Sequence, residues 1–133
     1  MRITVCGSLK FKSEMESFAK ELISKGLVVR YPTFESQKVA DSYLNADPQT
    51  QKVMVMGWTY NHFQWIKESD YVFVFNKEGK CGNSTTLEIG YAKALGIPVV
   101  ALEHDEEMSR EVLYDDFAES SKEFIQLLGD FHA

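Results

Sequence analysis

The stretch that precedes Glu88 combines the residue types of an anion-binding loop with a single carboxylate. It reads KEGKCGNSTTLE over residues 77–88, so glycine, amide and hydroxyl side chains lie directly before a helical pattern. Backbone amides at the start of a helix bind anions, and hydroxyl and amide side chains add further donors. We therefore expect Asn83, Ser84 and Thr85 to contact a phosphate group or the hydroxyl groups of a sugar.

Glu88 itself has two interpretations. Thr85 and Glu88 match the S/T-x-x-E capping box, in which the glutamate would stabilise the helix by about 1 kcal/mol. The alternative is that Glu88 reacts with a ligand, because the start of this helix is expected at the ligand crevice. Gly90 favours the alternative, since a glycine inside a helix costs about 1 kcal/mol and predicts close packing of the helix on a sheet. The two roles are compatible.

A second loop, CGSLKFK over residues 6–12, has similar chemistry. Gly7 would let the backbone approach a ligand closely, and Ser8 offers a hydroxyl donor. An ordinary strand-to-helix turn is the alternative. Lysines flank both loops and predict positive charge where the loops meet: Lys10, Lys12, Lys77 and Lys80.

The elements that must position these loops alternate along the chain. Apolar runs predict strands at residues 3–7, 27–32, 71–75 and 98–102. Helical spacing predicts helices from Ser13, as the start of a capping box with Glu16, to Gly26, from Pro48 to about Glu68, after residue 86, and over residues 120–131. Residues 33–47 read as a loop with a short helix, and residues 103–118 show no clear pattern.

Alternating strands and helices predict an α/β fold. We expect a single domain over residues 1–133, with an open, doubly wound parallel sheet of four to five strands, flavodoxin- or Rossmann-like, and helices on both faces. Ligands of such sheets bind beyond the carboxyl ends of the strands. This rule selects four places: Gly7–Ser8, Pro32, residues 76–86 and Glu103–His104.

The long helix predicted at residues 48–68 carries two apolar faces. Val53, Met56, Tyr60, Phe63 and Ile66 form one stripe, and three aromatic residues lie on a neighbouring face: Trp58, His62 and Trp65. So much aromatic surface around one helix predicts burial on two sides, including by a partner subunit.

Composition and charge exclude several classes. The 133 residues carry a formal net charge of −6, which argues against binding to a nucleic acid polymer. Neither Cys6 nor Cys81 lies in a zinc-binding spacing, so we expect reduced thiols and no metal site. No signal peptide and no apolar run long enough to cross a bilayer is found, which predicts a cytoplasmic protein without a membrane partner.

Three stretches carry a resemblance to a known family: VCGSL at residues 5–9, NHFQWIKESDYVFVFN at 61–76, and GNSTTLEIGYAKALGIPVV at 82–100. Together they resemble the nucleoside 2-deoxyribosyltransferase superfamily, in particular its short branch, which includes the 2'-deoxynucleoside 5'-phosphate N-hydrolases. The resemblance implies that Glu88 is a nucleophile that attacks the anomeric carbon, displaces the base and forms a glycosyl-enzyme ester. Water or another base then resolves the ester.

The resemblance also implies roles for other residues. Gly7 and Ser8 would bind the 5'-phosphate of a nucleotide together with Asn83, Ser84 and Thr85. Asp70 matches the "SD" position of the family, with a structural role. The family implies no cofactor, and it implies a homo-oligomer, for which the exposed face of the 48–68 helix is the expected interface.

One position departs from the family. Where its enzymes often carry a tyrosine in the first strand to orient the nucleophile, this sequence has Thr4. That role would be unfilled, or it would pass to Tyr91, which lies three residues beyond Glu88, or to Tyr60 or His62 on the long helix.

The function expected from these observations is cleavage or transfer of the N-glycosidic bond of a nucleoside or nucleoside 5'-monophosphate. The sequence does not separate a hydrolase from a transferase. Two alternatives differ in class: a nucleotide-binding or sensing module without catalysis, and a phosphoribohydrolase of the lysine-decarboxylase-like type, whose glycine-threonine-glutamate loop resembles GNSTTLE. Such a phosphoribohydrolase would show a longer glycine run and more arginine.

Overall fold

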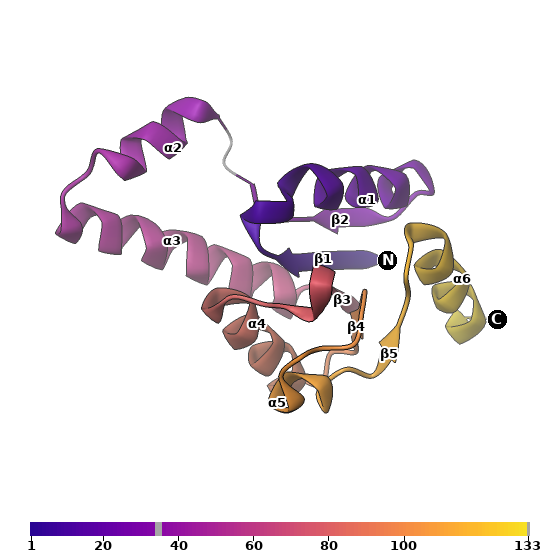
Figure 1. The fold of residues 1–133 in the computed structure, drawn as a ribbon. Coiled ribbons are helices and arrows are strands. Elements are labelled where there is room, and N and C mark those ends of the chain that lie inside the picture. The colour runs from indigo at the N-terminus through magenta and orange to yellow at the C-terminus, as the bar shows by residue number, and fades with distance from the viewer. Residues whose placement is uncertain (34–35, 133) are drawn as a thin grey trace.

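A parallel sheet forms the centre of the computed structural model, which describes residues 1–33 and 36–132, with side chains to residue 129. Among the described residues the sheet has five strands in the order β2-β1-β3-β4-β5, and every pair is parallel (Figure 1). The strands are β1 (Arg2–Gly7), β2 (Val28–Arg30), β3 (Tyr71–Phe75), β4 (Val99–Ala101) and β5 (Asp116–Phe117). This is the strand order of a flavodoxin-like doubly wound sheet, so the predicted fold class is confirmed.

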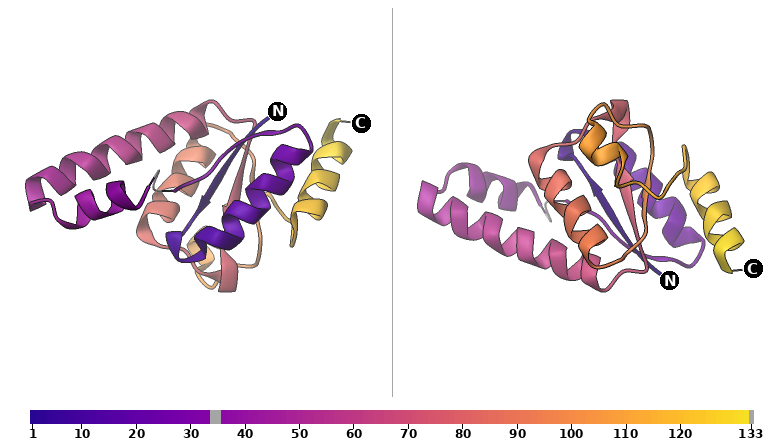
Figure 2. Two further views of the ribbon diagram at one scale, coloured as in Figure 1. Left: turned by 90° about the horizontal axis from the view of Figure 1, so that it is seen from above. Right: turned by 90° about the horizontal axis from the view of Figure 1, so that it is seen from below.

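Helices cover both faces of the sheet. They are α1 (Lys12–Ser24), α2 (Gln37–Leu44), α3 (Pro48–Lys67), α4 (Asn83–Ala94), α5 (Met108–Glu111) and α6 (Ser121–His132), with short 3-10 turns η1 (Leu9–Phe11) and η2 (Lys77–Gly79). Helices α1 and α6 pack on one face, and α4 and the C-terminal part of α3 pack on the other (Figures 1 and 2). None of the helices in the described part of the chain is long and apolar enough to span a bilayer.

Two hydrophobic cores lie on the two sides of the sheet. Successive side chains of a strand point to opposite faces, so Phe73 of β3 joins one core and Val72 and Val74 join the other. Phe73 packs with Phe18 of α1 and Phe124 of α6, whereas Val74 packs with residues of α3 and α4. All five residues of β3 are buried, as the continuous apolar run predicts.

The N-terminal half of α3 projects beyond the sheet together with α2 (Figure 2). As predicted, the helix begins at Pro48, and Asp47 caps it by accepting a hydrogen bond from the Thr50 amide at 2.8 Å. The apolar stripe predicted along α3 is buried only at its C-terminal end. Ile66 is fully buried, but Val53, Met56 and Tyr60 are 57%, 46% and 65% exposed.

Three local predictions need correction or extension. Ser13 does not cap α1: the helix begins at Lys12, directly after η1, and its cap residue Phe11 makes no side-chain cap bond. The short helix expected in residues 33–47 is α2, and residues 34 and 35 of that stretch lie outside the described residues. Residues 103–118, which show no clear pattern in sequence, contain α5 and the two-residue strand β5.

Candidate active site

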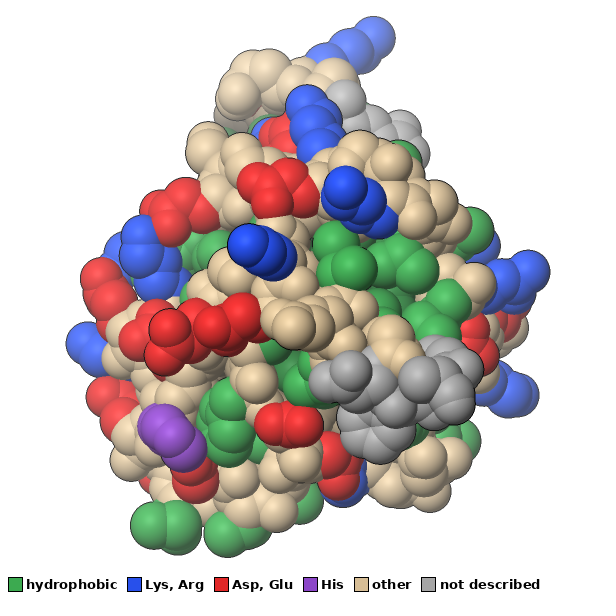
Figure 3. Space-filling model, turned by 90° about the vertical axis from the view of Figure 1, so that its right-hand side faces the viewer, with side chains coloured by type: hydrophobic (Ala, Val, Ile, Leu, Met, Phe, Trp, Pro, Cys, Tyr) green, Lys and Arg blue, Asp and Glu red, His purple; other side chains and the backbone are tan. Residues whose placement is uncertain are grey.

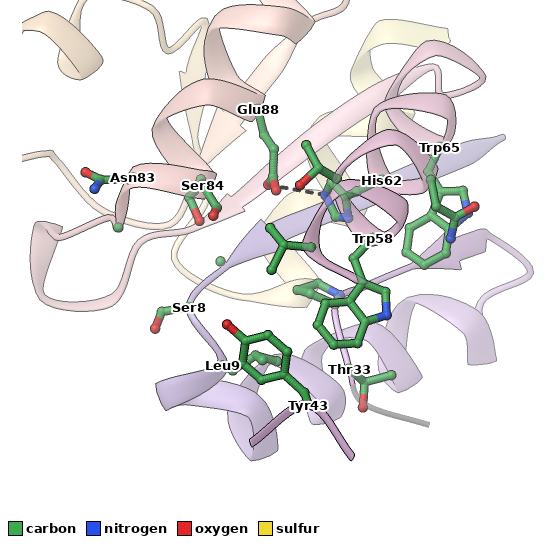
Figure 4. Close-up of a pocket in the computed structure, with 17 residues that line it drawn as sticks. Ser8, Leu9, Thr33, Tyr43, Trp58, His62, Trp65, Asn83, Ser84 and Glu88 are labelled. Carbon is green, nitrogen blue, oxygen red and sulfur yellow. Dashed lines mark ion pairs between the residues drawn. The ribbon is translucent and has the colours of Figure 1, made fainter. Parts of the chain in front are cut away.

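A pocket of about 490 Å³ lies beyond the carboxyl ends of β1 and β3, between α3 and the start of α4. Gly7–Leu9 after β1, Pro32–Thr33 after β2, and residues 82–85 at the start of α4 all line it (Figure 4). Three of the four predicted strand ends therefore meet, and the volume is typical of a small-molecule site.

The fourth predicted place, Glu103–His104, does not join this pocket. It lines a separate hollow of about 900 Å³ on the α1 and α6 side of the molecule. The reason is the strand order. The crevice of a doubly wound sheet lies between β1 and β3, where the chain changes direction, and β4 lies on the far side of β3.

Glu88 projects into the pocket rather than capping its helix. Helix α4 begins at Asn83 after the cap residue Gly82, so Glu88 lies in the second turn and the capping-box interpretation is wrong. Its side chain is 15% exposed, and its Oε2 lies 3.3 Å from Nε2 of His62 (Figure 4). Of the three residues considered as partners of this carboxylate, His62 is the one that reaches it.

Cys6 completes a small polar cluster around Glu88. Its Sγ lies 3.3 Å from His62 Nε2, and one ligand atom from each of Cys6, His62 and Glu88 lies within 4.8 Å of the other two. Burial, and then the charge of Glu88 and a hydrogen bond to it, raise the pKa of the Cys6 thiol well above its usual value. Cys6 is therefore a neutral thiol near neutral pH.

Thr4, at the position where the resemblance expects a tyrosine, lies outside this cluster. Its hydroxyl pairs with Ser69 Oγ at 2.6 Å, and Ser69 Oγ donates to the Trp65 carbonyl at 2.7 Å. Cys6 lies two residues further along β1 and points to the same face of the sheet. Cys6 and His62 thus supply the protein groups beside Glu88.

All five residues predicted to bind substrate line the pocket: Gly7, Ser8, Asn83, Ser84 and Thr85. Asn83 and Ser84 are exposed at the start of α4, and Thr85 is buried. Gly7 has a packing reason to be glycine, because an added Cβ would lie 3.0 Å from Met15 Sδ and 3.1 Å from the Phe75 carbonyl.

The lysines do not line the pocket, contrary to the charge expected there. Lys77 pairs with Glu14, and Lys10 and Lys77 lie over the ring of Phe11. Neither lysine nor arginine occurs among the described residues that line the pocket. An anion in this pocket would therefore be bound by the backbone amides at the start of α4.

Sequence reasoning missed part of the aromatic wall opposite α4. Trp58 and Trp65 of α3 line the pocket, and Tyr43 of α2 joins them with its ring 5.5 Å from that of Trp58 (Figure 4). The face of α3 that carries Trp58, His62 and Trp65 was visible as a pattern, and the structure shows that it forms a cavity wall. The sequence did not indicate that Tyr43 lines a pocket, because Tyr43 lies in a short helix whose position depends on its packing against α3.

The remaining supporting residues lie elsewhere. Asp70 accepts a hydrogen bond from the Arg2 amide at 2.8 Å, at the end of β3 opposite the pocket. The Tyr91 ring stacks on Phe63 with centroids 4.5 Å apart, and Tyr91 does not line the pocket. Gly90 is exposed, and an added Cβ there would meet nothing within 4 Å, so the predicted close packing at this glycine is wrong.

A second polar cluster lies on the other side of α4. Arg110 donates through Nε and Nη2 to the fully buried carboxylate of Asp105 at 2.8 to 3.0 Å, and Tyr114 donates to it at 2.5 Å. Burial alone would raise the pKa of Asp105, but the hydrogen bonds from Arg110 and Tyr114 outweigh it and hold the pKa below its usual value. Burial raises the pKa of nearby Cys81 to about 11. Arg110 also donates to Thr86 Oγ1 at 3.3 Å, which ties residues 105–114 to the start of α4.

Comparison with known proteins supports the fold. No protein-family model and no curated protein sequence matches the chain. Among solved structures, a 2-deoxyribosyltransferase from Bacillus psychrosaccharolyticus is 17% identical with a TM-score of 0.62, over 93% of this chain and 90% of that one. The CMP N-glycosidase of Clostridium botulinum is 17% identical with a TM-score of 0.52, over 97% and 98%.

A conserved protein from Enterococcus faecalis V583 is 15% identical with a TM-score of 0.56, over 95% of both chains. At these identities the likeness concerns the fold. The chain therefore has the fold of a 2-deoxyribosyltransferase and of a nucleotide N-glycosidase over nearly its whole length. This is the fold that the sequence resemblance implies.

Proposed function

We propose that this protein cleaves or transfers the N-glycosidic bond of a nucleoside or nucleoside 5'-monophosphate, with residues 1–133 as a single catalytic domain. Two structural neighbours, a CMP N-glycosidase and a 2-deoxyribosyltransferase, support this class of reaction. The single observation that carries the proposal is the position of Glu88. Its carboxylate points into a nucleotide-sized pocket, between the start of α4 and an aromatic wall.

In the proposed reaction, a Glu88 oxygen attacks C1' of the sugar. The bond from C1' to the base nitrogen breaks, its electron pair stays on the base, and the base leaves after protonation. Attack of water or of a second base on C1' then breaks the ester and restores Glu88. His62 and Cys6 contact the carboxylate, so they hold it in position to attack the sugar.

The two ends of the pocket suit the two ends of a nucleotide. The amides that open α4, with the side chains of Ser8, Asn83, Ser84 and Thr85, would bind the 5'-phosphate. The aromatic wall of Tyr43 and Trp58 would stack on the base. Glu88 lies between these two ends (Figure 4), so a nucleotide bound in this way would have its sugar beside the carboxylate.

A free nucleotide suits this protein better than a nucleic acid polymer. On the face that carries α6, acidic and basic side chains are interspersed and hydrophobic side chains are visible between them (Figure 3). Polymer binding requires clustered cations, and neither this face nor the net charge of −6 supplies them.

We also propose that two copies associate through the projecting half of α3. Val53 and Met56 are exposed there, exposed Tyr60 continues the same stripe, and the pocket residues Val55 and Trp58 are their neighbours in the helix. A second copy on this surface would bury the apolar side chains and border the open side of the pocket. Light scattering should give a dimer or higher oligomer for the wild type and a smaller mass for Met56→Lys with Tyr60→Lys. A wild-type monomer would contradict this part of the proposal.

The reaction is tested by incubating the pure protein with deoxyribo- and ribonucleosides and their 5'-monophosphates and measuring free base. We expect release from at least one of them, loss of release in Glu88→Ala, and full release in Glu16→Ala, a matched change in an exposed ion pair with Lys20. Release that persists in Glu88→Ala would overturn the assignment of the nucleophile. Binding without release would indicate a sensing module.

A further inference from the structure

Three ligand atoms of different chemistry converge at the inner end of the pocket. They are Cys6 Sγ from β1, His62 Nε2 from α3 and Glu88 Oε2 from α4. The sulfur and the carboxylate oxygen each lie 3.3 Å from the same ring nitrogen, and all three lie within 4.8 Å of one another. Zinc bonds of about 2.3 Å to sulfur and about 2.0 Å to nitrogen or oxygen place tetrahedral ligand atoms about 3.3 to 3.6 Å apart. The cluster thus already has nearly the spacing of a zinc site.

We propose that Cys6, His62 and Glu88 form a Zn²⁺ site with three protein ligands and a fourth position open to the pocket. The donor set selects the metal. A thiolate and an imidazole suit zinc, whereas Ca²⁺ and Mg²⁺ require sites made mainly of oxygen. The residues lie 26 or more positions apart in sequence, so zinc-binding spacing in the chain could not reveal them.

The site is formed before metal arrives. Each ligand lies on a regular element of the fold: Cys6 within β1, His62 within α3 and Glu88 in the second turn of α4. Cys6 is fully buried and the His62 side chain is 9% exposed, so neither ligand has much freedom to turn toward water. Little conformational entropy is lost on binding, because the elements are held by the core.

Charge and protons balance in the loaded state. Zinc binds cysteine as the thiolate, glutamate as the carboxylate and histidine through the lone pair of a ring nitrogen, so any proton on these groups leaves to solvent on binding. The two positive charges of the ion then meet two negative charges, one on the thiolate and one on the carboxylate. The metal supplies the counter-charge that a buried Cys6 thiolate lacks in the free protein.

The loaded state also has a consequence that rests on the proposed function. Zinc bound to Glu88 Oε2 would withdraw negative charge from both oxygens of the carboxylate and weaken the nucleophile, so the zinc form would be a less active form of the enzyme. Removal of the ion by a chelator would restore the nucleophile. Zinc would thus be a reversible inhibitor that binds at the reacting group itself.

The site is tested with the full chain, freed of metal, and Co²⁺ as a spectroscopic probe. We expect one equivalent of Co²⁺ to give the intense visible bands of four-coordinate cobalt and a near-ultraviolet thiolate-to-cobalt band, both lost when Zn²⁺ is added. Cys6→Ser should remove the thiolate band, and His62→Ala should weaken binding by about tenfold or more. The matched control, Cys81→Ser, should retain every band, because Cys81 lies in the other cluster. Absence of stoichiometric binding, or a thiolate band that survives Cys6→Ser, would overturn the proposal.

Zinc titration of base release tests the consequence separately. We expect Zn²⁺ to inhibit base release by the wild type and a chelator to reverse the inhibition. The zinc concentration that halves the rate, measured for each protein relative to its own rate without zinc, should be higher for Cys6→Ser than for the wild type. The cobalt spectrum does not depend on turnover. A protein that binds cobalt through Cys6 but releases no base would therefore retain the metal site and reject the proposed function.

Discussion

Two polar clusters flank α4, and each combines a cysteine with a carboxylate. The pocket cluster contains Cys6, His62 and Glu88, and the anchor cluster contains Cys81, Asp105, Arg110 and Tyr114. In the anchor cluster the carboxylate accepts bonds from Arg110, Tyr114 and the Glu107 amide, and its side chain is 0% exposed. In the pocket cluster the carboxylate contacts His62 and Cys6 and also lines a cavity.

This difference shows how the role of a buried carboxylate can be inferred from its surroundings. A carboxylate whose lone pairs are all satisfied by the protein is fixed in place, and its contribution is to stability. A carboxylate that keeps an acceptor oxygen facing a pocket can bind or attack a ligand. Residue type and burial alone would not distinguish Asp105 from Glu88. What distinguishes them is that the Glu88 carboxylate lines a ligand-sized pocket, whereas the Asp105 carboxylate is enclosed by hydrogen-bond donors of the protein.

Replacement of Glu88 by glutamine should have the largest effect on activity. The amide keeps the size of the side chain and an acceptor for His62, but it is not a nucleophile. We expect base release to fall by about 10⁴-fold or more, as for other lost nucleophiles. The melting temperature should change little, because no fully satisfied network is broken. If the Glu88→Gln variant kept its rate of base release but lost stability, Glu88 would have a structural role like that of Asp105.

Replacement of Asp105 by asparagine should give the opposite result. Loss of the charge leaves the Arg110 guanidinium, 12% exposed, without its counter-ion. Breaking such a buried pair costs about 3 kcal/mol of unfolding free energy, which lowers the melting temperature of a domain of this size by about 10 °C. At a temperature where the variant is folded, kcat should stay within a few-fold of the wild type.

Acid provides an independent check on Asp105. Hydrogen bonds from Arg110 and Tyr114 hold its folded pKa below the value of about 3.9 in an unfolded chain. The stabilisation is therefore fully present above about pH 5 and is lost as the pH falls through 3.9 toward the lower folded pKa. Urea unfolding at several pH values should show this loss in the wild type and a smaller one in Asp105→Asn. Equal acid sensitivity in both proteins would remove Asp105 as its source.

Loss of the His62 contact should reduce activity by an intermediate amount. His62→Phe keeps an aromatic ring in the wall but removes the group 3.3 Å from Glu88. We expect kcat to fall by about 100-fold with a small change in KM, because His62 positions the nucleophile and is not the main contact of the substrate. His62→Gln, whose amide can reach Glu88, should recover part of the rate. Equal losses in kcat and stability for both variants would indicate a packing role.

The comparison also shows what the sequence could and could not reveal. Patterns that depend on a whole element were reliable: the apolar run 71–75 is buried on both faces, and Asp47–Pro48 starts α3. The rule that ligands bind beyond strand ends brought Gly7, residues 82–85 and Pro32 to one pocket.

Short motifs failed where tertiary structure decides. The S/T-x-x-E matches at Ser13–Glu16 and Thr85–Glu88 lie inside helices whose starts are set by the preceding turns. The same pattern at Ser120–Glu123 does lie at a helix start, where Ser120 Oγ accepts a hydrogen bond from the Glu123 amide at 3.1 Å. The two-residue strand β5 is too short for any periodicity, and it exists because it pairs with β4. The partners of Glu88 and Asp105 come from distant parts of the chain or from a stretch without a pattern. The roles of the two carboxylates could therefore not be separated in advance.

Substitution of Gly90, in the helix that lies between the two clusters, should have the smallest effect on stability. It lies in the interior of α4, it is exposed, and an added Cβ would meet nothing within 4 Å. Gly90→Ala should therefore stabilise the protein by about 1 kcal/mol through helix propensity, seen as a higher urea midpoint. Gly96 also has open space around it but has φ +74°, so Gly96→Ala should destabilise by about 1 kcal/mol. A loss of stability in Gly90→Ala that disappears on dilution would mean that a second copy covers this surface of α4, because only a neighbour absent at low concentration could exclude the methyl group.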